Sequence, residues 1–378
     1  MHELHTNKIQ ILLNFLSTTR KKALLILLFT SIACLRFYYC TQLPVSSGDL
    51  PRHIYYGFYA AKIGLTAAGH SLVELSPFLS GVVWSSLPYN YPIVALLFFT
   101  LIGKLSPTIF FAKLVLTLIE AINSWLVFKY SRQHLLALLY WASPISIWWV
   151  SHEGQFEPLQ SLFAIGALLT LQDRKYLAFI LLALAIQVKI TALLFLPYFV
   201  LGVRRDNLKD LLIAFIAFPI GFVPTLFAML HYPIITQIMS TVGACIHNPY
   251  YWNVLKYSMF DWNPWWLVVL DQCSTYGILL LLLIWTIRLR GIRSFFAPVC
   301  FIIFCKISSI CQFWYFVLFM PFLLPIQDNR KRFLLFALTP LLDISSLIEI
   351  ISGWFGHVFG YNVGDYYKGV DVFMKLII

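Results

Sequence analysis

Charged residues are scarce in this chain of 378 residues: they make up 11% of the sequence, whereas 60% is hydrophobic. A soluble protein of this length needs more charged surface, so the composition excludes an ordinary soluble enzyme and predicts an integral membrane protein. Cys-x-x-Cys spacings and the His-x-x-x-His and His-Glu-x-x-His motifs are also absent, which removes the usual sequence signals of zinc sites. The seven cysteines mostly fall in apolar runs and are predicted to be small core residues.

Other missing sequence features indicate which kind of membrane protein this is. No repeat, low-complexity tract or soluble domain interrupts the chain, so residues 1–378 are predicted to form a single membrane domain. The N-terminal segment has a long basic approach and no small-x-small cleavage site, which indicates an anchor rather than a removed signal. Despite a net charge of +11, no basic block is long enough for a nucleic-acid partner. The absence of Asn-x-Ser/Thr sequons favours a bacterial inner membrane; a eukaryotic source would imply the ER membrane.

The lysines and arginines gather in clusters that predict the topology through the positive-inside rule. These clusters are Lys8/Arg20/Lys21/Lys22, Lys129/Arg132, Arg174/Lys175, Arg204/Arg205/Lys209, Arg288/Arg290/Arg293 and Arg330/Lys331/Arg332. If every cluster faces the cytoplasm, an even number of crossings separates each neighbouring pair. The result is an all-α fold with about eleven crossings, a cytoplasmic N-terminus and an outer C-terminus. The predicted crossings are 23–41, 107–128, 134–150, 158–172, two within 176–203, 210–230, 265–287, two within 294–327, and 333–351.

This requirement for an even number of crossings between basic clusters, which we call parity, also predicts which segments lie outside. They are the first outer loop with its interfacial helices (42–106), the outer loop 231–264 and the C-terminal tail 352–378. The apolar run 92–103 is shorter than the roughly 20 residues that a crossing needs, so Tyr91–Leu101 is predicted to be a re-entrant or interfacial helix. In the double crossing 176–203, the turn falls near Gln187–Ile190 and brings Lys189 to the outer surface.

Parity also gathers the unusual polar residues on the outer face: Asp49, Arg52, His53, Asn90, His152, Glu153, Gln155, Glu157, Lys189 and Lys306. Carboxylates and cations in one outward cleft suit a substrate whose phosphate must be held as it leaves. No nucleotide sugar is available outside the cytoplasm, so an activated group must arrive on a lipid. A lipid-phosphate-linked sugar meets both conditions.

The segment Gly48-Asp49-Leu50-Pro51-Arg52-His53 is the most informative stretch. A helix that starts at Pro51 would have Asp49 near its N-cap, where free N–H groups stabilise a carboxylate. Two interpretations are open at this point: Asp49 only caps an interfacial helix, or it is a catalytic carboxylate at the water–lipid boundary.

The order of landmarks resembles the GT-C superfamily of polytopic glycosyltransferases, which use polyprenyl- or dolichyl-phosphate sugars. The acidic motif of the first outer loop is matched by Gly48-Asp49, and the Tyr-x-Tyr-Pro segment by Tyr89-Asn90-Tyr91-Pro92. The second outer loop is matched by Ser151–Glu157. The run from Lys306 to Tyr315, with Gln312 and Trp314, is similar to a Lys-x-x-x-Ser-Gln-Tyr-x-x-Trp-Tyr segment of the GPI mannosyltransferase I catalytic subunit.

The resemblance implies an inverting transfer of a hexose, with mannose favoured, to a lipid- or glycan-linked acceptor. Asp49 would be the general base, as in bacterial polyprenyl-phosphate-sugar transferases that carry one Asp. The implied donor-phosphate ligands are Lys189, Lys306 and Arg52. The implied sugar and acceptor ligands are His53, Tyr91, His152, Glu153, Gln155, Gln312 and Trp314. Pro51 replaces the second acid of the GPI enzyme's Asp-x-Asp, so no metal ligand is assigned, although a divalent cation, Mg²⁺ or Mn²⁺, stays open.

Competing interpretations stay open as well. Lys189 and Lys306 could extend to the outer headgroups, and Glu153 and Glu157 could be ordinary loop acids. Glu120, the deepest acid, is expected to pair inside the helix bundle. The chain could instead be a flippase or transporter of a lipid-linked sugar or solute, or another membrane transferase. A transporter would have repeated halves and ionisable groups at mid-membrane.

Overall fold

The computed structural model describes residues 18–44, 49–82, 84–204, 208–238, 277, 317–326 and 328–339. Throughout these residues the chain is helical and has no strand, as the sequence predicts. The helices are α2 (Thr18–Thr41), α3 (Asp49–Ile63), η1 (Leu65–Gly69), α4 (Leu72–Leu75), η2 (Pro77–Leu79), α5 (Ile93–Leu105), α6 (Ile109–Ser131), α7 (His134–Trp141), α8 (Pro144–Ser146), η3 (Ile147–His152), α9 (Glu157–Thr170), α10 (Lys175–Val188), η4 (Ile190–Phe195), α11 (Leu196–Arg204), α12 (Leu208–Gly221), α13 (Val223–Met229), α18 (Phe319–Leu323) and α19 (Asn329–Leu338).

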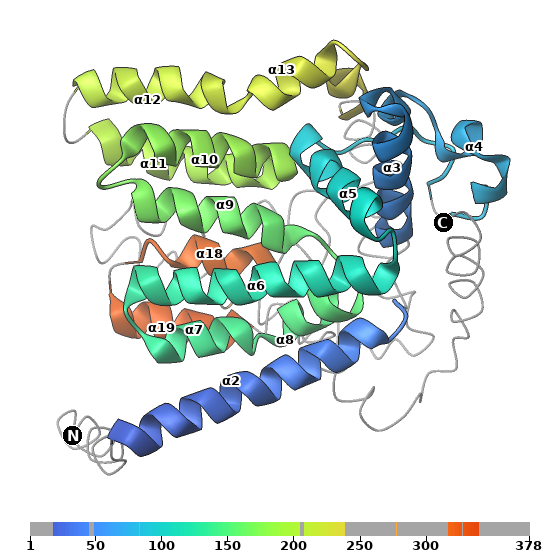
Figure 1. Ribbon diagram of the computed structural model, residues 1–378. Coiled ribbons are helices and arrows are strands. Elements are labelled where there is room, and N and C mark those ends of the chain that lie inside the picture. Colours follow the sequence, from blue (N-terminus) through green and yellow to red (C-terminus); the bar gives the residue numbers. More distant parts are fainter. Residues whose placement is uncertain are drawn as a thin grey trace.

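Helices α6, α9, α10 and α12 run side by side, and α3, α4 and α5 lie at one end of them (Figure 1). The connections α6–α7, α9–α10 and α11–α12 lie at the opposite end (Figure 1). An ion pair of 2.8 Å between Lys175 and Asp210 joins the beginnings of α10 and α12 there. Basic residues therefore gather at the end of the bundle that is remote from α3.

Two of the described helices are long and apolar enough to cross a membrane: Lys22–Thr41 and Ile109–Ser131. The pair Leu212–Gly221 and Val223–Met229, which is bent by 41°, makes a third if it is one span. These helices match the predicted crossings 23–41, 107–128 and 210–230. Ile93–Leu105, Lys175–Val188 and Ile190–Val200 are apolar but shorter, so the described part of the chain does not reach the predicted count. Most of the predicted crossings 265–287, 294–327 and 333–351 lies outside the described residues, which include only 277, 317–326 and 333–339 of them.

The predicted crossing 134–150 is not one continuous helix. Helix α7 ends at Trp141, and Pro144 begins the short α8, which continues into the π-helix η3. Proline has no backbone N–H to donate to the preceding turn and its ring clashes with that turn, which favours a break at this position. The segment that follows is not a surface loop either, because its polar residues are buried: Ser151, His152, Glu153, Gln155 and Glu157.

The break predicted near Gln187–Ile190 is confirmed. Helix α10 ends at Val188, Lys189 has extended backbone, and the 3₁₀-helix η4 leads into α11, which runs back beside α10 (Figure 1). The amide of Gln160 on α9 holds this turn by donating to the carbonyl oxygen of Lys189 at 2.6 Å. Gln187 accepts from the backbone N–H of Thr225 at 3.1 Å and so ties the end of α10 to the bend between α12 and α13.

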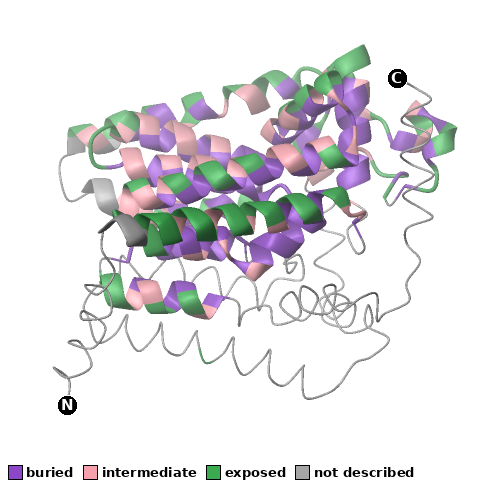
Figure 2. Cartoon of the chain, turned by 60° about the horizontal axis from the view of Figure 1, so that its bottom comes forward, coloured by how far each residue is buried: buried purple, intermediate pink, exposed green. Residues whose placement is uncertain are grey.

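Helices α3 and α5 cross very closely because each has a glycine at the crossing point. A Cβ atom at Gly103 would lie 2.5 Å from the backbone carbon of Gly57 and the nitrogen of Phe58. A Cβ atom at Gly57 would overlap the carbonyl group of Phe99. Most residues of α3 are buried, whereas the outer helices of the bundle expose one face (Figure 2). The glycine pair thus fixes the position of α3 and of the charged residues at its start.

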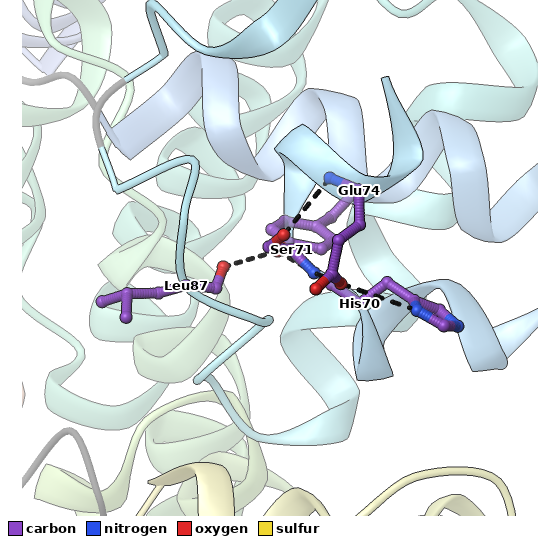
Figure 3. A network of polar contacts seen from close by, with 5 residues as sticks. His70, Ser71, Glu74 and Leu87 are labelled. Atoms are coloured by element: carbon purple, nitrogen blue, oxygen red, sulfur yellow. Dashed lines mark hydrogen bonds and ion pairs between the residues drawn. The ribbon is translucent and has the colours of Figure 1, made fainter. Parts of the chain in front are cut away.

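The segment between α3 and α5 is braced by polar contacts (Figure 3). The hydroxyl of Tyr56 donates to the carbonyl oxygens of His70 at 3.0 Å and Leu87 at 2.7 Å. Ser71 and Glu74 form a capping box at the start of α4, and Glu74 pairs with His70 at 3.7 Å. This bracing fixes the path of the chain that leads to Tyr89, Asn90 and Tyr91 beside α3.

Candidate functional site

Two charged residues open α3. The helix begins at Asp49, two residues earlier than the predicted start at Pro51, and Asp49 is partly buried in its first turn. Arg52 follows one turn later with only 1% of its surface exposed. Its guanidinium donates to Oδ1 of Asn90 at 2.8 Å and to the carbonyl oxygen of Pro88 at 2.7 Å. Arg52 is therefore anchored to the segment before α5, with its charge close to Asp49.

Lys189 and Glu157 bring a second pair of charges to the same place. The Lys189 ammonium forms an ion pair with Oε1 of Glu157, and both side chains are buried. The ammonium also lies 5.0 Å from the centre of the Phe156 ring and 5.8 Å from that of Tyr91, within cation–π range. Within the described part of the chain, Oε2 of Glu157 has no hydrogen-bond partner. Lys189 therefore does not extend to lipid headgroups, and Glu157 is not an ordinary loop acid.

His53 lies in an aromatic cage beside these charges. Its ring stacks on Phe99 at 4.9 Å and meets the edges of Tyr91 at 4.8 Å and Phe156 at 4.9 Å. Among the described residues, neither ring nitrogen has a hydrogen-bond partner. Burial, with Arg52 and Lys189 nearby, lowers the pKa of His53 well below its usual range, so the imidazole is neutral. The predicted sugar ligands His53 and Tyr91 are thus brought together with Asp49, Arg52 and Lys189.

Electrostatics tie these residues into one group. Burial raises the pKa of the Asp49 carboxyl, and the positive charges of Arg52 and Lys189 oppose that rise. Burial also raises the pKa of Glu157, against the charge of Lys189. We call Asp49, Arg52, Glu157 and Lys189 the charged cluster. A carboxyl with a raised pKa is a stronger base than an ordinary aspartate, and two fixed cations beside it can hold an anion.

The predicted ligands of the second outer loop form a different group. Nδ1 of His152 lies 2.7 Å from Oε1 of Glu153, and the His152 ring stacks on Trp148 at 4.2 Å. Burial lowers the pKa of His152, although Glu153 opposes this. Gln155 is also buried, and in the described residues its Nε2 has no hydrogen-bond partner.

Gly154 explains how this buried loop fits against α3. Its φ is +78°, a left-handed conformation that glycine adopts without strain. A Cβ atom at this position would overlap the side chain of Leu50 and lie 3.1 Å from Cγ of Lys113. The close approach seats the loop directly on the first turn of α3. It thereby brings the Phe156 ring to 4.9 Å from the His53 ring on α3.

A third polar group lies deeper in the bundle and includes a residue that the sequence analysis missed. Arg36 on α2 is fully buried and donates to the carbonyl oxygen of Trp141 at 2.8 Å and to the hydroxyl groups of Ser146 and Ser151, both at 3.0 Å. Ser146 in turn donates to Glu120, which also accepts hydrogen bonds from the side chains of Asn123 and Tyr140. The prediction that Glu120 pairs inside the bundle is confirmed. A lone arginine in the apolar run 23–41 was the signal for Arg36.

Three predicted site residues, Lys306, Gln312 and Trp314, lie outside the described residues, as does Gly48. No three His, Cys, Asp or Glu side chains in the described ranges come together in a way that could hold a metal ion. In the charged cluster, an ammonium group lies with the two carboxylates of Asp49 and Glu157. By themselves, these residues do not form a site for Mg²⁺ or Mn²⁺, which prefer an all-oxygen shell.

Comparison with protein-family models, with curated proteins and with solved structures found no match for this chain.

Proposed function

We propose that this chain is a multi-pass membrane glycosyltransferase of the GT-C type. It moves a hexose, with mannose favoured, from a polyprenyl-phosphate donor to a lipid- or glycan-linked acceptor on the extracytoplasmic face of a bacterial inner membrane, or of the ER membrane in a eukaryote. The observation that carries the proposal is the charged cluster: a partly exposed carboxylate on α3 with two cations, one from α3 and one from the break after α10. The cluster gathers at the end of the bundle opposite the basic connections, which face the cytoplasm under the positive-inside rule.

The chemistry follows from the placement of these charges. Asp49 is partly exposed, so an acceptor hydroxyl can reach it, and it takes the proton of that hydroxyl. The hydroxyl oxygen then forms a bond to the anomeric carbon as the bond from that carbon to the phosphate oxygen breaks, with inversion. The polyprenyl phosphate leaves with the bonding electrons, and Lys189 and Arg52 stabilise its charge. Tyr91, half-buried beside Lys189, can contact the face of the sugar.

The buried charges in the middle of the bundle do not favour a transporter. A transport pathway needs ionisable groups that face a cavity. The guanidinium of Arg36 is instead held by Trp141, Ser146 and Ser151, and both carboxylate oxygens of Glu120 accept hydrogen bonds from the protein. This group stabilises the packing of α2, α6 and the segment after α7.

The test is an assay on the purified chain in lipid vesicles that contain polyprenyl-phosphate mannose and a glycolipid extract as acceptor. Release of polyprenyl phosphate, measured by mass spectrometry, is the expected result. Asp49→Asn should slow this release by about 10²–10⁴-fold, because the amide cannot take the proton. The matched control is Asp210→Asn at the opposite end of the bundle, which should release polyprenyl phosphate at the wild-type rate. Sugar that crosses the bilayer with its phosphate bond intact would overturn the proposal in favour of a transporter.

A further inference from the structure

Glu157 is a buried acid that uses only one of its two carboxylate oxygens. It lies in the first turn of α9, and its Oε1 pairs with the Lys189 ammonium. Its Oε2 accepts no hydrogen bond from any residue that the structure describes, although the side chain is fully buried. A buried acceptor without a donor costs free energy, most of all on a charged group. Oε2 therefore marks a place where a bound molecule can donate a hydrogen bond.

His53 and Tyr89 share this property and lie close by. Phe156, the residue before Glu157, connects the two sides: its ring centre lies 4.9 Å from that of His53 and 5.2 Å from that of Tyr91. The His53 ring in turn lies 5.7 Å from the Tyr89 ring. Both ring nitrogens of His53 and the hydroxyl of Tyr89 are buried and have no hydrogen-bond partner in the ranges that the structure describes. Polar groups that can still form hydrogen bonds therefore gather around two aromatic rings.

The chemistry of these groups selects a neutral ligand with several hydroxyl groups. Glu157 and Lys189 form a pair with no net charge, so Oε2 favours neither an anion nor a cation. A carboxylate oxygen only accepts, whereas a neutral imidazole and a phenol hydroxyl each donate and accept. Sugar hydroxyls can meet all of these demands, and the C–H face of a sugar packs on aromatic rings. Tyr91 is half-buried, so it lies between the surface and the buried Glu157.

We propose that Glu157 binds the hexose of the donor by accepting a hydrogen bond from one of its hydroxyl groups at Oε2. His53 and Tyr89 bind further hydroxyl groups beside it, and movement of the Tyr91 side chain admits the sugar. The inference rests on the donor proposed above, but it concerns how the sugar is bound and not whether it is transferred.

The same inference changes which acid binds the sugar. The resemblance to the GT-C enzymes implies Glu153 for this role. In the structure, however, Oε1 of Glu153 lies 2.7 Å from Nδ1 of His152. Glu157 instead has a carboxylate oxygen to offer and lies beside Lys189, which is proposed to hold the donor phosphate. One ion pair would then place the phosphate and the sugar of the donor next to each other.

The test is equilibrium binding, measured by native mass spectrometry of the full-length protein in lipid nanodiscs. The probes are polyprenyl phosphate and polyprenyl phosphates that carry mannose, glucose or galactose. We expect the wild-type protein to prefer one of the sugar-bearing probes over polyprenyl phosphate. Glu157→Gln, which keeps the size of the side chain but removes its charge, should reduce this preference about tenfold, as expected for the loss of a hydrogen bond to a charged group.

A second reading on the same variant separates this role from a structural one. Glu157→Gln releases Lys189 from its ion pair, so the variant should bind polyprenyl phosphate at least as tightly as the wild-type protein. Gln160 still holds the Lys189 backbone in that variant, because it donates to the Lys189 carbonyl oxygen at 2.6 Å. Damage to the fold would weaken the binding of all probes alike. The matched control is Asp210→Asn, which removes the acid of another lysine–carboxylate pair and should keep the wild-type preference.

If Glu157→Gln does not fold, the wild-type protein supplies the test with monodeoxy versions of the preferred sugar. One of these probes should lose about tenfold in affinity, because it leaves Oε2 without its donor. The inference is overturned if the wild-type protein prefers no sugar-bearing probe, if every deoxy probe binds as well as its parent, or if a folded Glu157→Gln keeps the full preference. A preference that is lost in Glu153→Gln instead would assign the sugar to the other acid and would also overturn it.

Transfer is measured separately, as release of polyprenyl phosphate in the presence of acceptor. A preference that depends on Glu157 without any release would reject only the enzyme proposal. Release together with a preference that does not depend on Glu157 would reject only the present inference.

Discussion

Replacing Gly103 by alanine tests the close crossing of α3 and α5 on which the charged cluster depends. The new Cβ atom would lie 2.5 Å from two backbone atoms of α3, whereas carbon atoms are comfortable at 3.5 Å or more, so the helices must separate by about 1 Å. Backbone atoms cannot rotate out of the way as a side chain could. The cost therefore belongs at the upper end of the range for overpacking, about 3 kcal/mol.

Alanine also favours a helix over glycine by about 1 kcal/mol, which leaves a net loss of about 2 kcal/mol for Gly103→Ala. Gly166 on α9 provides the matched control. Its added Cβ atom would lie 3.5 Å from Cδ1 of Leu181, an ordinary contact, so Gly166→Ala should gain about 1 kcal/mol. The two substitutions are chemically identical but have opposite expected signs.

Thermal unfolding of the purified protein in detergent measures the difference. Gly103→Ala should lower the Tm by about 2–3 °C, and Gly166→Ala should raise it. A displacement of about 1 Å at the start of α3 should also slow any reaction at Asp49 by about 10²-fold, a loss that Gly166→Ala should not show. A Gly103→Ala protein that unfolds at or above the wild-type temperature would refute the close crossing.

Two more predictions concern buried charge. Burial raises the pKa of Asp49, so its carboxyl favours folding below the pKa of the unfolded chain, and this contribution is lost as the pH rises through the folded-state pKa. Asp49→Asn should therefore raise the Tm at pH 7, and a gain that persists at acid pH would contradict this origin. Arg36→Met leaves the Glu120 group without its nearby positive charge and should cost about 3–5 kcal/mol. In chemical denaturation, adding Glu120→Gln should restore part of that loss, and a fully additive double variant would show that the two residues are not coupled.

The sequence predicts the parts of this fold that depend on local hydrophobic pattern and on the even number of crossings between basic clusters. Long apolar runs identify α2 and α6, and the spacing of basic clusters requires the reversal at Lys189 although that region reads as one helix. The approach of Asp49 to Lys189 follows from the same parity, because both are predicted to lie at the outer end.

The sequence is less informative where distant segments decide the environment of a side chain. From their neighbours in the sequence, Glu153 and Glu157 would be exposed loop residues. Both are buried in the structure, because distant segments such as α3 and the break after α10 pack around this loop. Arg36 appears as one charge in an apolar run, and its partners lie more than a hundred residues away along the chain. The break after Trp141 could have been predicted from Pro144, but hydrophobicity alone favoured a continuous helix.

The π-helix η3 has a consequence for which insertions and deletions the chain tolerates. A π-helical turn contains one residue more than an α-helical turn. Loss of a single residue there would return the segment to α-helical pitch and rotate the following side chains by about 100°. Ser151 would then turn away from Arg36, and the ring of His152 would leave Trp148. A change of one residue in this short turn would therefore disturb two buried groups at once, whereas the same change in the exposed connection at Arg132–Gln133 would leave both groups in place.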